Sequence, residues 1–267
     1  MNFKEYYHYC KTRYKGNYFN KYPLDELTVS MNKLPVPEDY FVKIKNIREY
    51  CDNKIKNNED LFDKNHKNII KIDNFYDSDE IIDLGNHFGK VLEENTYNCH
   101  CISEAVLVYK SLPNGPKRTS WIWHYDDNVN EQIKLIIYLN DVNKNTGAIQ
   151  FLLKDDEGKK IKTSRLSPKI NLKQVYYHSR IDNNSLLKFV SEGYKPTSLT
   201  GIAGTHCLFD PNCIHKATTP TEMPYRLCLV YNFRPYHKPV ENRVTKKFTR
   251  SWSNLGHIKS YSTSVKT

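Results

Sequence analysis

The segment IKLIIYL (133–139), followed after the turn NTG (145–147) by AIQFL (148–152), indicates the fold class of this chain. Both segments are short and rich in β-branched and aromatic residues, and a turn signal separates them, as is typical of neighbouring strands. Four further segments have the same character: AVLVY (105–109), WIWH (121–124), HCLF (206–209) and RLCLVY (226–231). Short strands at this spacing predict a β-sandwich or jelly roll over residues 100–236.

Residues 1–99 are predicted to be a mainly helical extension. After Pro37, apolar residues recur at helical spacing: Tyr40, Ile44, Ile47, Cys51 and Ile55. A strand candidate, NIIKID (68–73), precedes a second helix that Asp77 and Glu80 are expected to cap. The apolar face of this helix comprises Ile81, Leu84, Phe88, Val91 and Leu92. The expected fold class is therefore mainly β with α+β character, with the N-terminal helices packed on the β core.

Two other regions differ in composition from the β segments. Residues 154–200 are polar and are predicted to form an insertion or lid within the core. Residues 237–267 form a basic C-terminal extension, with seven Lys and Arg against one acidic residue. The predicted order is thus an N-terminal extension (1–99), a core (100–236) and a tail (237–267).

Composition narrows the class of protein. The 267-residue chain has no run of about 18 apolar residues and no secretory signal at its start, so we expect a cytoplasmic protein without a membrane partner. Its seven cysteines are scattered without a Cys-x-x-Cys pair, which indicates reduced thiols. The net charge of +10 permits nucleic-acid binding, but no basic block with interleaved aromatics supports it. The sequence leaves the oligomeric state open.

Three residues have the chemistry of a metal site. His124 and Asp126 lie two residues apart, so on a strand their side chains would point the same way. An imidazole and a carboxylate are two corners of a 2-His-1-carboxylate iron site, and His215 would supply the third. Arg226 follows 11 residues after His215 within an apolar strand, where its guanidinium needs an anionic partner such as a carboxylate.

These four residues, at these spacings, resemble the motif of the Fe(II)- and 2-oxoglutarate-dependent dioxygenases, specifically the phytanoyl-CoA dioxygenase-like family. Segments 139–151 and 201–209 also resemble its core strands, and the resemblance covers about 68–236. It implies a cupin-like double-stranded β-helix with a catalytic Fe(II) held by His124, Asp126 and His215. It also implies that 2-oxoglutarate, the cosubstrate, chelates the iron and pairs with Arg226. Reaction with O₂ would then give succinate, CO₂ and a hydroxylated small-molecule substrate.

The chain departs from the family at two places. Many relatives carry Ser or Thr where this chain has Cys228, and the loop LKDDEG (153–158) replaces a Pro-Gly-Ser-His stretch that often borders the substrate. Because this loop often borders the substrate, the substrates of the family are not carried over.

Tyr138 and Gln150 either reach 2-oxoglutarate or substrate, or pack within the core.

Three further residues have both a functional and a structural interpretation, and two tryptophans have a structural one. His206 is a candidate to support the metal ligands, Lys110 to pair with a carboxylate, and His178 to touch substrate. Trp121 and Trp123 are expected to pack against the scaffold. Plain packing or surface roles are the simpler interpretation for all five.

Two alternative functions compete with small-molecule hydroxylation. The same chemistry on a nucleic acid or a protein side chain is favoured slightly by the net charge and the basic tail. A non-catalytic jelly-roll binding module is disfavoured, because a degenerate site would be free to lose one of its ligands or Arg226.

Overall fold

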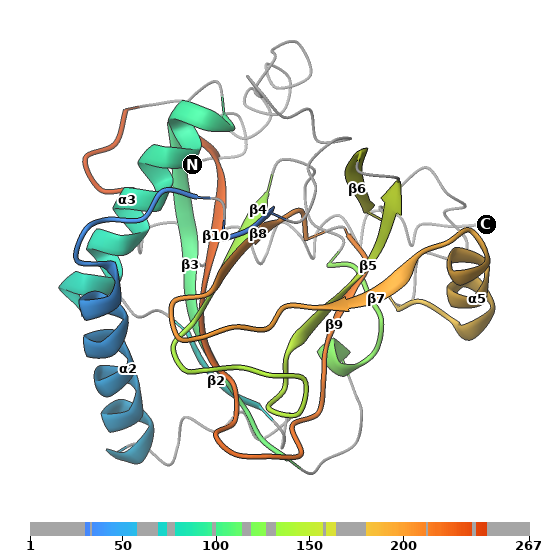
Figure 1. Ribbon diagram of the computed structural model, residues 1–267. Helices are drawn as coiled ribbons and strands as arrows, with labels where there is room; N and C mark the ends of the chain where they lie inside the picture. Colours follow the sequence, from blue (N-terminus) through green and yellow to red (C-terminus); the bar gives the residue numbers. More distant parts are fainter. Residues whose placement is uncertain are drawn as a thin grey trace, which may run out of the picture.

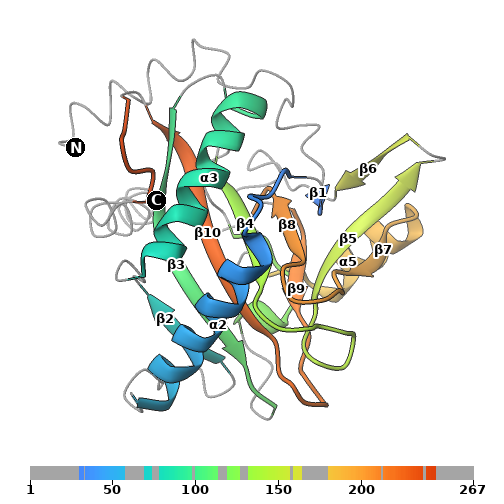
Figure 2. The same ribbon diagram turned by 60° about the vertical axis from the view of Figure 1, so that its left-hand side comes forward.

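The computed structural model describes residues 30–32, 34–57, 69–73, 78–97, 100–113, 119–126, 132–156, 159–163, 180–211, 213–236 and 239–244. These residues form two antiparallel β-sheets, and two helices run along the outer face of the larger sheet (Figures 1 and 2). The prediction of a mainly β protein with helices packed on it agrees with this architecture. Within the described residues, no helix is long and apolar enough to cross a membrane.

The larger sheet has six strands. Their order across the sheet is β1 (Ser30–Met31), β8 (His206–Phe209), β4 (Ile133–Tyr138), β10 (Leu227–Tyr236), β3 (His100–Ser111) and β2 (Ile69–Asp73). The strands predicted around 105–109, 133–139, 206–209 and 226–231 all lie in this sheet, and 68–73 forms its edge strand β2.

The smaller sheet is built around β5. It comprises β6 (Lys159–Thr163), β5 (Ile149–Asp156), β7 (Lys195–Ser198) and β9 (His215–Ala217), the last also paired with β5. Strand β7 lies within the segment predicted as an insertion or lid, yet it pairs directly with β5 and so belongs to the sheet. The same segment contains helix α5 (Asn183–Ser191).

The alternation of side chains on β4 divides the core in two. Ile133, Leu135 and Ile137 pack toward the helices, whereas Ile136 and Tyr138 pack toward the smaller sheet. This is the two-residue period of a strand that is buried on both faces. The space between the sheets is therefore lined by every second residue of β4 and β10.

Helices α2 (Tyr40–Asn57) and α3 (Asp79–Asn95) bury the faces predicted for them, apart from Ile55, which is only partly buried. The cap of α3 was assigned incorrectly to Asp77, which lies outside the described residues. Ser78 is the N-cap instead, and its hydroxyl accepts a hydrogen bond of 3.4 Å from the Ile81 amide.

The segment 121–124 was also predicted incorrectly as a strand. Trp121 is the last residue of a 3₁₀ helix, η3 (Thr119–Trp121). Among the described residues, His124 pairs through isolated bridges with His215 and Arg180. Aromatic and β-branched residues favoured a strand here, but bridges to two separate chain segments shape the backbone instead.

The first part of the predicted C-terminal extension packs on α3. Arg243 donates to the Glu93 carboxylate at 2.7 Å, and Val244 is buried against the helix. Residues 245–267 lie outside the described residues, so the role of the basic tail stays a prediction.

Gly85 on α3 marks a close approach of this helix to the sheet. A Cβ atom at this position would lie 2.7 Å from the Tyr231 ring and would also meet the Val244 side chain. We expect Gly85→Ala to lower the free energy of unfolding by about 1–3 kcal/mol, because two packed layers must separate. Chemical denaturation measures the change, with the exposed Lys90→Ala as the control; equal stability of the two variants would contradict the close approach.

Candidate metal centre

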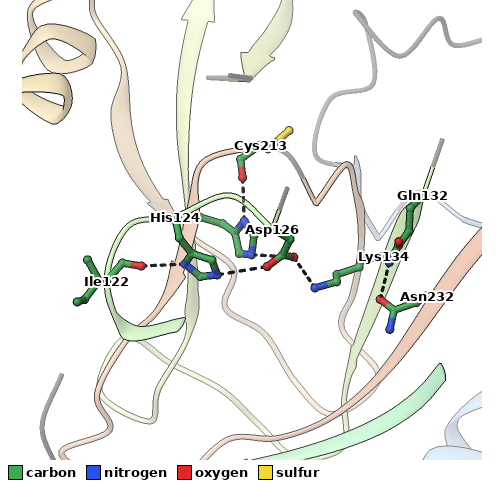
Figure 3. Close-up of polar contacts among 8 residues, drawn as sticks. Ile122, His124, Asp126, Gln132, Lys134, Cys213 and Asn232 are labelled. Carbon is green, nitrogen blue, oxygen red and sulfur yellow. Dashed lines mark hydrogen bonds and ion pairs between the residues drawn. The ribbon is translucent and has the colours of Figure 1, made fainter. Parts of the chain in front are cut away.

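His124, Asp126 and His215 gather at one point between the sheets. Their ligand atoms lie within 4.8 Å of one another. The His124 Nε2 atom is 3.5 Å from Asp126 Oδ1, and the His215 Nε2 atom is 3.7 Å from Asp126 Oδ2 (Figure 3). The structure therefore brings together the three residues that the sequence indicated as metal ligands.

Backbone hydrogen bonds hold the three residues in place. The amides and carbonyls of His124 and His215 are bonded to each other in both directions, at 3.0 and 2.8 Å. The Asp126 amide donates to the Pro211 carbonyl at 2.9 Å. Two chain segments 91 residues apart are thus fixed by the main chain, before any side chain contributes.

The backbone also selects the tautomer of both histidines. The Nδ1 atom of His124 lies 2.8 Å from the Ile122 carbonyl, and that of His215 lies 2.8 Å from the Cys213 carbonyl (Figure 3). Because a carbonyl only accepts, each Nδ1 carries the proton and each Nε2 of a neutral ring keeps its lone pair. Burial lowers the pKa of His215 to about 3, so this ring is neutral near pH 7.

Asp126 is ionised at the centre of the group. Burial alone would raise the pKa of its carboxyl, but the positive charge of Lys134 holds that pKa well below its usual range. The Lys134 ammonium contacts Asp126 Oδ2 directly. The ligand set therefore consists of one carboxylate and two imidazole lone pairs.

This arrangement of donors fits a divalent cation. The Nε2 atoms of both histidines lie within 3.7 Å of carboxylate oxygens of Asp126, so one cation can contact all three groups. Two imidazoles and one carboxylate on one side of a metal leave positions open for further ligands, as in non-haem Fe(II) sites.

Arg226 lies immediately before β10 and is buried, with 6% of its surface exposed. Its Nε atom has no hydrogen-bond partner, and no acidic side chain pairs with it among the described residues. It lies close enough to Tyr138 and Cys228 that its charge opposes the burial that raises their pKa values. A buried guanidinium in this position fits an anionic ligand.

Tyr138 and Gln150 both lie near this region. The Tyr138 hydroxyl donates to the Leu199 carbonyl at 2.9 Å and accepts from the Ile149 amide at 3.2 Å. The Gln150 amide donates to the Ser198 hydroxyl at 3.0 Å. Both side chains therefore join neighbouring segments, and their contact with 2-oxoglutarate stays a prediction.

Tyr138→Phe separates these two roles. Because the only hydroxyl proton is used on Leu199, we expect the variant to lose about 1–2 kcal/mol of stability, with less than a threefold change in the KM for 2-oxoglutarate. Thermal denaturation and steady-state turnover measure the two effects. A large rise in KM without loss of stability would instead assign the hydroxyl to the cosubstrate.

The remaining candidates lie elsewhere. His206 packs against the rings of Tyr40 and Phe88 on the helical side of the larger sheet, in keeping with its simpler packing interpretation and not with support of the metal ligands. Lys110 pairs with Asp52 of α2 at 3.7 Å. Trp121 and Trp123 are buried, in keeping with a packing role. His178 lies outside the described residues.

Sequence reasoning missed Lys134 and Arg180. Lys134 is the charged residue of the apolar strand β4, so the argument that identified Arg226 would also have identified Lys134. Arg180 forms a backbone bridge with His124, and the Asp126 charge partly offsets the burial that lowers the pKa of Arg180. Only the fold brings Arg180 to the site.

Of the comparisons with known proteins, only the one with solved structures gives matches, and these concern the fold. Neither the models of protein families nor the curated proteins include a match to this chain. Solved structures do match, including EctD from S. alaskensis with bound Fe, with a TM-score of 0.54, 12% identity and coverage of 85% of this chain and 80% of that one.

Two further solved structures give similar values. The non-heme alpha-ketoglutarate-dependent carbocyclase SnoK from nogalamycin biosynthesis has a TM-score of 0.53 and 12% identity, covering 81% of this chain and 84% of its own. HygX from Streptomyces hygroscopicus, with nickel and 2-oxoglutarate bound, has a TM-score of 0.50 and 12% identity, covering 79% and 84%. At these identities the likeness establishes a shared fold.

Proposed function

We propose that this chain is an Fe(II)- and 2-oxoglutarate-dependent oxygenase that hydroxylates a C–H bond of a small-molecule substrate on a double-stranded β-helix core. The observation that carries the proposal is the convergence of His124, Asp126 and His215 in the same interior that buries Arg226 without an acidic partner among the described residues. The fold shared with three proteins supports it: EctD has bound Fe, SnoK is a non-heme alpha-ketoglutarate-dependent carbocyclase, and HygX has nickel and 2-oxoglutarate bound.

Each residue has a defined task in this proposal. His124 and His215 offer Nε2 lone pairs because their Nδ1 protons are bound to backbone carbonyls. Asp126 supplies the anionic ligand, and Lys134 fixes its second oxygen. Arg226 binds the far carboxylate of 2-oxoglutarate through a charge-assisted hydrogen bond. The apolar side chains between the sheets, among them Phe151 and Phe209 beside His215, exclude water from the reaction.

The bound iron would supply the activation of O₂. Over the whole reaction, one oxygen atom enters the succinate formed by decarboxylation of 2-oxoglutarate, and the other is inserted into the substrate C–H bond. The products are succinate, CO₂ and an alcohol, so atoms and electrons balance without a further reductant. The closer resemblance to the phytanoyl-CoA dioxygenase-like family rests on the sequence motifs.

Anaerobic titration tests the binding half of this proposal. Protein freed of metal is expected to bind one equivalent of Fe(II), and then 2-oxoglutarate with the visible charge-transfer absorption of a chelated 2-oxo acid. Asp126→Ala is the matched variant, because it removes the anionic ligand. Absence of Fe(II) binding by the folded wild-type chain would overturn the proposal.

A further inference from the structure

A polar strip lies beside the metal centre on a face that is otherwise apolar. It comprises Gln132, Lys134 and Asn232. Lys134 and Asn232 are directly opposite each other on β4 and β10, and the Gln132 amide donates to the Asn232 side-chain carbonyl at 3.4 Å. Figure 3 shows the strip on the side of Asp126 away from His124. Farther along the same face come buried apolar residues such as Ile136 and Val230.

The strip is separate from the position proposed for the far carboxylate of 2-oxoglutarate. Arg226 precedes Asn232 by six residues along the extended chain of β10, which corresponds to about 20 Å at the rise of a strand. Lys134, by contrast, contacts the ligand Asp126. The metal ligands therefore lie next to the strip, and a cosubstrate reaching toward Arg226 leaves the strip to another molecule.

The charges around the centre do not balance without that molecule. Fe(II), Lys134, Arg180 and Arg226 would bring five positive charges, while Asp126 and dianionic 2-oxoglutarate bring three negative ones. Asp210, buried at the end of β8, adds one negative charge at most. Counted over these described residues, with Fe(II) and 2-oxoglutarate bound, at least one positive charge of the group is therefore not offset.

We propose that the substrate carries an anionic oxygen group, a carboxylate or a phosphate, bound by Lys134 with Asn232 beside it. Arg180, whose backbone pairs with His124, adds a second positive charge at the metal group. This inference rests on the proposed function and adds the substrate class. Once a metal shares the charge of Asp126, the Lys134 ammonium has donors available for a second acceptor, because it carries three. Charge-assisted hydrogen bonds of this kind are about twice as strong as neutral ones, so they discriminate between an acid and its amide.

Paramagnetic relaxation of small probes tests the inference without turnover. The full chain is loaded anaerobically with Mn(II) and saturating 2-oxoglutarate, and the proton relaxation of benzoate, phenylphosphonate and benzamide is measured by NMR. The protons of 2-oxoglutarate serve as the internal readout for the proposed function. We expect at least one of the two anions to bind about tenfold more tightly than benzamide, and the tighter anion identifies carboxylate or phosphate chemistry.

Two variants and a control locate the effect. Lys134→Met is expected to reduce the preference for the anion to less than twofold, and Lys134→Arg to restore most of it. Lys45→Met, which removes the same charge from the exposed face of α2, should leave it unchanged. If the Lys134→Met variant no longer binds Mn(II), the Arg180→Gln variant is used in its place. Its preference for the anion over benzamide is expected to fall at least threefold.

The possible failures are distinguishable. If 2-oxoglutarate itself shows no relaxation by Mn(II), the proposed function fails. If 2-oxoglutarate is relaxed but benzamide binds as well as both anions, the proposed function stands and the substrate class is wrong. Anions that displace 2-oxoglutarate, or an anion preference that persists in both Lys134→Met and Arg180→Gln, would also overturn the assignment to Lys134.

Discussion

Replacing His215 with alanine is expected to lower Fe(II) affinity by roughly 100-fold or more and to abolish turnover of 2-oxoglutarate. The imidazole is one of the three candidate ligands among the described residues, and even loss of a residue that merely orients a ligand costs about 10–100-fold in metal sites. Anaerobic Fe(II) titration and succinate release under air measure the two effects.

A matched control separates this loss from damage to the fold. His87 lies on α3, where its ring contacts the Pro35 carbonyl on the outer side of the molecule. His87→Ala should keep both Fe(II) binding and turnover within twofold of wild type. If His215→Ala remained folded and bound Fe(II) as tightly as His87→Ala, His215 would not be a ligand.

Replacing Arg226 with methionine is expected to raise the KM for 2-oxoglutarate by about 10–150-fold, the equivalent of roughly 1.5–3 kcal/mol for hydrogen bonds between charged groups. The metal-free protein should not lose stability in proportion. Its buried guanidinium has no acidic partner among the described residues, and an apolar side chain of similar length removes that desolvated charge.

Arg226→Met is therefore expected to weaken binding of 2-oxoglutarate without a matching loss of stability. Saturation with 2-oxoglutarate and Mn(II) should raise the Tm of wild type, because ligands that bind only the folded state stabilise it, and should raise the Tm of the variant much less. Arg48→Met, on the exposed side of α2, is the control. An unchanged KM together with a large loss of stability would mean that Arg226 is a structural residue.

The spacing of a few charged and aromatic residues was enough to predict the metal group. His124 and Asp126 were predicted to share a face because side chains alternate on a strand. The structure brings them together by another route, since His124 follows a 3₁₀ turn and pairs only through bridges. Residue chemistry and motif resemblance thus identified three residues that the structure brings together, while the local backbone was predicted incorrectly. That the three residues bind a metal stays a prediction.

Other features depend on contacts that a sequence does not contain. The alternation of side chains along β8 places His206 on one face of the sheet. Only the sheet order shows that this face packs against Tyr40 and Phe88 and not against the metal group. The strands β6 and β7, KKIKT and KPTS, carry polar residues and lack the apolar alternation that indicates a half-buried strand. Pairing with β5 makes them strands.

Lys134 could be predicted in part. A lysine within an apolar strand indicates a buried partner, by the argument applied to Arg226, but only the structure shows that the partner is Asp126. Lys134 forms the polar strip together with Gln132 and Asn232, and the anionic substrate class is inferred from this strip and the charges around it.

The stoichiometry of 2-oxoglutarate turnover decides whether this chain is an oxygenase. The purified chain, with Fe(II) under air, is given 2-oxoglutarate labelled at C1, and labelled CO₂, succinate and O₂ consumption are followed together. The oxygenase account predicts equal amounts of CO₂ and succinate, dependent on both Fe(II) and O₂ and absent in Asp126→Ala. Wild-type protein that binds Fe(II) and 2-oxoglutarate, yet forms no succinate above the Asp126→Ala level with any carboxylate or phosphate substrate offered, would contradict it.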